Sequence, residues 1–156
     1  MAYDLETLMN DVKAIMTSNL NTKISAINTE KGDSTVLDTI PTDAYFLQDL
    51  DHETLNYNPF VFYSLEEVEG SGFAPQTPQE ALITIIIVVA DQGYMDTANR
   101  MFRYSRALKE VFEENFFIKS NSNFLNINVL APVPLTTLNQ SMEYRASGIQ
   151  IKTIIG

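Results

Sequence analysis

The sequence predicts an α+β domain, in which an antiparallel or mixed β-sheet packs against two main helices at about residues 3–20 and 96–115. Two segments have apolar residues at helical spacing, and several others alternate or are rich in β-branched residues. These segments follow the order helix, strands, helix, strands, which differs from the regular alternation of a βαβ chain. A length of 156 residues with 45% apolar content fits a single domain over residues 1–156.

The first helix is predicted from apolar residues that recur every three or four positions: Leu5, Leu8, Met9, Val12, Met16 and Leu20. We expect it to end near residues 19–21, because asparagine favours helix ends over helix interiors. Residues 22–28 then predict a short strand, and residues 29–42 predict a loop containing Gly32 and Pro41. Residues 45–47 fit either a short strand or a helical turn.

Two segments in the middle of the chain predict strands at 60–68 and 81–90. The second is a nearly continuous β-branched run, which is typical of a central strand buried on both faces. The connection at 69–79 is rich in glycine and proline and is longer than a tight hairpin. It therefore contains a candidate contact loop at Gly70, Ser71, Gly72 and Phe73. A phosphate-binding role is disfavoured, because a strand follows these glycines where a helix N-terminus is needed.

The second helix has the clearest signals, since Asp96 can accept hydrogen bonds from its first-turn amides and apolar residues line one face. It should end near Asn115. The tail predicts a strand at 123–130, ended by Pro132 and Pro134. A last strand is predicted at 147–155, with a possible extension back to residue 144.

The net charge of −10 is unevenly distributed. Residues 1–80 hold 14 acidic and 3 basic side chains and residues 81–156 hold 6 and 7, so the two parts carry −11 and +1. An acidic chain is a poor match to nucleic acid or to an anionic membrane surface. The apolar run at 81–90 is about half the length of a bilayer span, so we expect a soluble protein without a membrane partner.

Basic side chains gather in the first part of the second helix, at Arg100, Arg103, Arg106 and Lys109. The glutamates that follow predict the intrahelical pairs Arg106–Glu110 and Lys109–Glu113. Two interpretations stay open. The helix presents a solvated face of mixed charge, or its basic strip meets an acidic surface of another copy around Glu66, Glu67 and Glu69.

No residue pattern predicts catalysis, a cofactor or a metal site. The chain has no cysteine, which excludes thiol catalysis and cysteine-based zinc sites. The single histidine, His52, lies among acidic residues without further ligands at metal-site spacing. Glu66 and Glu67 are adjacent on a predicted strand and point to opposite faces, so they cannot act as an acid–base pair.

The chain has a short N-terminal helix and a β-branched strand that ends at Asp91-Gln92-Gly93. The helical segment that follows reads Met101-Phe102-Arg103-Tyr104-Ser105-Arg106-Ala107-Leu108-Lys109-Glu110-Val111-Phe112-Glu113-Glu114-Asn115. This layout resembles the tail terminator (tail completion or neck) proteins of tailed bacteriophages. The element order over residues 60–156 is also similar. The resemblance implies a non-catalytic viral subunit that forms a homo-oligomeric ring, commonly a hexamer, at the head–tail junction. Its neighbours would be tail-tube and head-connector proteins, with DNA only in transit. The implied location is the virion, after assembly in the host cytoplasm.

Two other classes of function stay open. The first is a non-catalytic adaptor that holds a peptide or another protein with the 69–79 loop. The second is an enzyme that uses His52, for which loss of an activity in a His52→Ala variant would be the first indication. The molecular mass in solution separates a ring from an adaptor.

Overall fold

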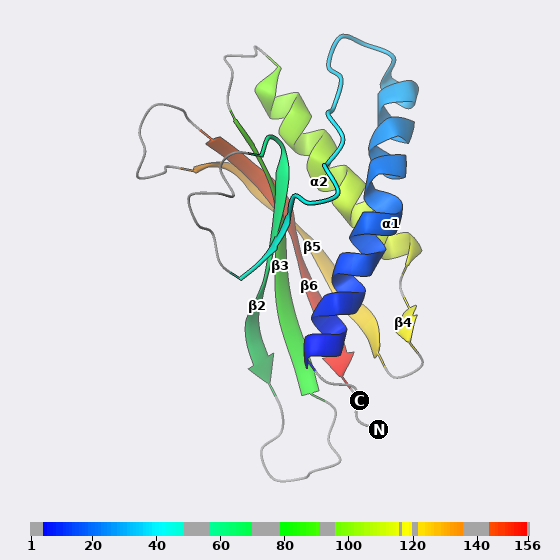
Figure 1. Cartoon of the computed structure of the whole chain (residues 1–156), viewed down its shortest axis with the longest axis vertical. Helices are drawn as coiled ribbons and strands as arrows, with labels where there is room; N and C mark the ends of the chain where they lie inside the picture. The colour runs from blue at the N-terminus through cyan, green and yellow to red at the C-terminus, as the bar shows by residue number, and fades with distance from the viewer. Residues whose placement is uncertain are drawn as a thin grey trace.

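The computed structural model describes residues 5–48, 57–69, 79–90, 96–115, 117–119, 122–135 and 144–155. Over this part of the chain, two helices pack on one face of a six-stranded sheet (Figure 1). The helices are α1 (Leu5–Lys31) and α2 (Thr97–Glu114). The strands are β1 (Tyr45–Leu47), β2 (Phe60–Glu69), β3 (Gln79–Ala90), β4 (Phe117–Lys119), β5 (Ser122–Leu135) and β6 (Tyr144–Ile155). The predicted α+β class is confirmed.

The strand order is β1-β2-β3-β6-β5-β4, with β1 and β2 parallel and the other neighbours antiparallel. In the central strand β3, the side chains facing the helices are buried, while Leu82, Thr84 and Ile86 on the other face are only half-buried. The expectation that β3 is buried on both faces was therefore wrong for most of its length. The cause is that α1 and α2 both cover the same side of the sheet.

α1 extends about ten residues beyond its predicted end and includes the segment predicted as a strand at 22–28. Its buried stripe continues at helical spacing through Leu20, Ile24 and Ile27. The helix ends at Gly32, which has a φ of +59° and donates its amide to the Asn28 carbonyl at 3.0 Å. A left-handed residue at this position is a common helix stop, and glycine adopts it without strain.

Two asparagines inside α1, Asn21 and Asn28, bind the backbone of the loop that follows the helix. Asn28 donates to the Leu37 carbonyl at 2.9 Å and accepts from the Leu37 amide at 2.8 Å. Asn21 makes the same pair of bonds with Ile40, at 2.8 and 2.7 Å. The loop thus runs back along α1, between the two helices in Figure 1. Its Leu37 and Ile40 side chains join the hydrophobic core.

The remaining elements agree with expectation except in the tail. α2 is confirmed, residues 45–47 form a strand, and β6 includes the extension to Tyr144. Pro132 and Pro134 do not end β5, which continues to Leu135 through an irregularity between Leu130 and Val133. On its outer side, β5 pairs with the described strand β4 only at Ser122 and Asn123. Proline, which has no backbone N–H to donate, is therefore tolerated farther along β5. β4 itself was not predicted from any residue pattern.

Candidate functional site

Half of the predicted basic strip is used to hold the chain's own loop. Arg103 donates hydrogen bonds to both carboxylate oxygens of Asp33, at 2.9 and 2.6 Å, and to the Thr35 carbonyl at 2.7 Å. Arg100 donates to the Val36 carbonyl and pairs with Asp96 at 3.2 Å. Both guanidinium side chains are mostly covered as a result. They lie between α2 and the loop, and they present little charge to the outside.

Asp96 stands at the N-cap position of α2, but its side chain makes no capping hydrogen bond. Its carboxylate accepts from the Thr35 hydroxyl at 2.5 Å and from Arg100 instead. These two donors lower the pKa of Asp96, with the Thr35 hydrogen bond as the largest cause. The predicted capping role of Asp96 was therefore wrong, because its carboxylate oxygens accept from Thr35 and Arg100 in place of the helix amides.

Because Asp33 pairs with Arg103, the stability of the fold should depend on pH. The hydrogen bonds from Arg103 lower the pKa of Asp33 from 3.8 to about 2. A carboxyl group whose folded-state pKa is depressed stabilises the fold above its unfolded pKa, and this contribution is lost as the pH falls through the folded value. We expect Asp33→Asn to unfold more easily than the wild type at pH 7, with a difference that shrinks between about pH 4 and pH 2. Urea titrations at pH 7, 4 and 2.5 measure this, and a difference independent of pH would contradict it.

The other half of the strip stays partly exposed. The side chains of Arg106 and Lys109 are 37% and 44% exposed. Arg106 pairs with Glu30 of α1 at 2.6 Å and with Glu110 at 3.3 Å, and Lys109 pairs with Glu113 at 3.0 Å. The two predicted intrahelical pairs are confirmed. Exposed pairs of this kind contribute little to stability because water screens their charges, so another acidic group can share these cations at little cost.

Arg106 and Lys109 border an apolar groove of about 470 Å³ between α2 and β5. The groove is lined by Phe102, Ser105, Arg106 and Lys109 of α2 and by Val129, Leu130, Ala131 and Pro132 of β5. Phe102 is 57% exposed and Val129 is 50% exposed. Sequence reasoning missed this groove because it ended β5 near Leu130. The available signal was Phe102, a large apolar residue outside the predicted buried face of α2.

The acidic residues predicted on β2 lie at the opposite edge of the sheet. Glu66 and Glu67 are exposed, and the neighbouring Val68 is 38% exposed. β1 pairs with β2 only at residues 61–63, so no described strand borders the outer side of β2 beyond Leu65. Glu69 ends β2, and its side chain lies outside the described part of the structure. The candidate loop residues Gly70, Ser71, Gly72 and Phe73 and the histidine His52 also lie outside the described residues.

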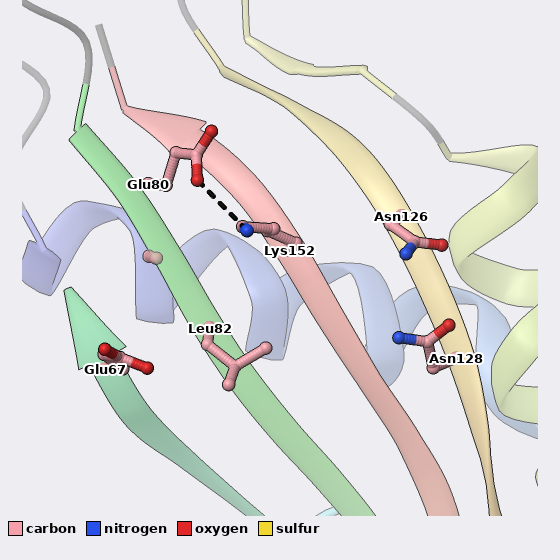
Figure 2. A pocket seen from close by; sticks show the side chains of 7 residues that line it. Glu67, Glu80, Leu82, Asn126, Asn128 and Lys152 are labelled. Atoms are coloured by element: carbon pink, nitrogen blue, oxygen red, sulfur yellow. Dashed lines mark ion pairs between the residues drawn. The ribbon is translucent and has the colours of Figure 1, made fainter. Parts of the chain in front are cut away.

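A polar pocket of about 220 Å³ lies on the sheet face away from the helices (Figure 2). Its lining includes Glu67 of β2, Glu80 of β3, Lys152 of β6, and Asn126 of β5, and Glu80 pairs with Lys152 at 3.2 Å. The side chains labelled in Figure 2 come from β2, β3, β6 and β5. This lining can donate and accept hydrogen bonds. Within the described ranges, no three acidic or histidine side chains come close enough together to hold a metal ion.

No protein-family model matches the chain, and no curated protein matches its sequence. Neither described helix has the length and apolar character needed to cross a membrane. The structure thus offers two surfaces with distinct chemistry. One is the apolar groove with a cationic border between α2 and β5, and the other is the acidic end of β2 with its polar pocket.

Proposed function

We propose that this protein is a structural subunit that assembles with copies of itself into a ring, as a tail terminator at the head–tail junction of a tailed bacteriophage. The observation that carries the proposal is the groove between α2 and β5. Phe102 and Val129 expose apolar surface side by side there, next to two cations. Apolar surface with a polar border is the usual composition of a protein–protein interface.

The resemblance to tail terminators also supports the use of the α2–β5 groove as a contact surface. The segment that carries it, residues 101–115, supplies all four α2 residues of the groove. The other arginines in that segment and just before it hold the loop after α1. A single helical segment thus stabilises the subunit on one side and offers a contact surface on the other. The proposed partners are sister copies, tail-tube proteins and head-connector proteins, with DNA passing through the ring.

Substitution of the exposed aromatic residue tests the proposal. We expect Phe102→Gln to weaken self-association at least tenfold, because central aromatic residues commonly dominate interface energies. Its effect on the unfolding free energy should stay within about 0.5 kcal/mol, since the side chain is exposed in the subunit. The matched control is Val36→Gln, which replaces a side chain that is 52% exposed in the loop after α1. This variant should assemble as the wild type does.

Electron microscopy of the purified protein then distinguishes the classes of function. The proposal predicts ring-shaped particles for the wild type and for Val36→Gln, and their loss for Phe102→Gln. Equal assembly of the two glutamine variants would contradict the use of the groove. A wild-type protein that never forms rings, alone or on tail tubes, would favour the adaptor class instead.

A further inference from the structure

We propose that the acidic end of β2 in one copy occupies the α2–β5 groove of the next copy, with Val68 on the apolar lining and Glu66 beside Lys109. This inference rests on the proposed function and specifies the partner of its contact surface. The contact would be head-to-tail, because it joins two different surfaces of the subunit. Such contacts build rings when the rotation between neighbours closes.

The positions of the two surfaces favour this arrangement. In the strand order β1-β2-β3-β6-β5-β4, β2 and β5 are each second from an edge, on opposite sides of the sheet. Each is bordered on its outer side by a strand that is only three residues long, β1 or β4. The end of β2 and the β5 side of the groove therefore both face outward. A copy cannot bring these surfaces together within itself, whereas two copies can.

The apolar contents of the two surfaces match. Val68 pairs in register with Ala81, a residue that is fully buried, so Val68 projects on the side of the sheet that carries the helices. Val129 pairs with the fully buried Ile149 and projects on that same side. Both valines remain substantially exposed. Burial of each in a contact would remove apolar surface from water at a gain of about 25 cal/mol per Å².

The charges also match. Glu66 and Glu67 are exposed next to Val68. Glu66 accepts a hydrogen bond from Ser64 at 2.5 Å, and Glu67 lines the pocket on the face away from the helices, so Glu66 is the acidic group of this pair that can turn toward the groove of a neighbour. Arg106 and Lys109 stand on the border of that groove. The cations have acidic neighbours in their own chain, but these exposed pairs are weak and can be shared. Complementary charges of this kind mainly set orientation and disfavour wrong partners. A second copy supplies the acidic surface directly, since residues 1–80 carry a net charge of −11 and residues 81–156 carry +1.

Cross-linking between introduced cysteines provides the test. The chain has no cysteine of its own, so only the introduced thiols can react. We would introduce Val68→Cys and Ala131→Cys together and treat the protein with a bismaleimide that has a short flexible spacer. Ala131 is an exposed residue of the groove. The expected result is a ladder of covalent oligomers up to the full ring. The matched control pairs Val68→Cys with Ser18→Cys, an exposed position on α1, and should give no ladder.

The outcomes separate this inference from the proposed function. Rings that form but give no Val68–Ala131 ladder would overturn the inference and leave the proposed function standing. Covalent dimers from Val68→Cys alone would also overturn it, since they would indicate a symmetric contact. A double variant that is folded but monomeric, matching a monomeric wild type, would overturn both.

A charge exchange gives an independent measurement. Lys109→Glu should weaken association by about fivefold, the upper range for one exposed ion pair. Addition of Glu66→Lys to that variant should recover most of the loss, because the pair is then restored with reversed signs. The pairing of these residues would be contradicted if Lys109→Glu and Glu66→Lys each weakened association and the double variant showed the sum of the two losses.

Discussion

We expect Gly148→Ala to lower the free energy of unfolding more than Gly32→Ala does, although both substitutions add one methyl group. Gly148 lies in β6 opposite Ile86 of β3, where the two central strands approach closely. A Cβ atom at this position would lie 1.9 Å from the Ile85 carbonyl oxygen and 2.7 Å from the Ile86 Cα. Both atoms belong to the backbone, so relief requires the two central strands to separate. The expected cost is at least about 3 kcal/mol, the upper range for overpacked cores.

Chemical unfolding of Gly148→Ala beside Gly32→Ala measures this prediction. Gly32 has a φ of +59°, and an added Cβ atom would lie 3.9 Å from the Thr29 carbonyl oxygen. Alanine there meets left-handed backbone strain without a clash, which costs about 1–2 kcal/mol. Similar unfolding free energies for the two variants would show that β3 and β6 can part without difficulty, contrary to the structure.

The second large effect is expected at the asparagines of α1. Asn21→Ala removes both hydrogen bonds to the Ile40 backbone and leaves its N–H and C=O without these partners. At about 1 kcal/mol for each bond, the loss is about 2 kcal/mol. Alanine returns roughly 0.5 kcal/mol through its higher helix propensity. A net loss of about 1.5 kcal/mol should therefore appear in the unfolding free energy.

The same substitution at Asn10 is the matched control, since Asn10 is an exposed residue of the same helix. Asn10→Ala should leave stability unchanged or raise it slightly through helix propensity. Opposite signs for the two variants would distinguish the loop-holding role of Asn21 from a general effect of asparagine in helices. A stabilised Asn21→Ala would contradict that role.

The main features of the fold could be predicted because they follow local periodicity. The stripe that includes Met101 and Leu108 marks α2, and the β-branched run around Ile85 marks β3. The end of α1 could not be found this way. Asparagine at residues 19–21 predicted the end of the helix, but the side chains of Asn21 and Asn28 bind a loop that is distant in sequence. This tertiary use outweighs their weak intrinsic preference.

The candidate site was only partly predictable for the same reason. Charge counting located Arg106 and Lys109 on α2 and paired them with their glutamates. It could not show that Arg100 and Arg103 bind the loop after α1, because that loop is placed by the fold. The groove depends on β5 continuing past Pro132 beside α2, which is also a tertiary arrangement.

Sedimentation velocity of the wild-type protein over a wide concentration range is the most direct test of self-assembly. We expect self-assembly to give one dominant closed species, whose mass is a whole multiple of the 17.6 kDa chain and which persists on dilution. A single 17.6 kDa species at every concentration would contradict it.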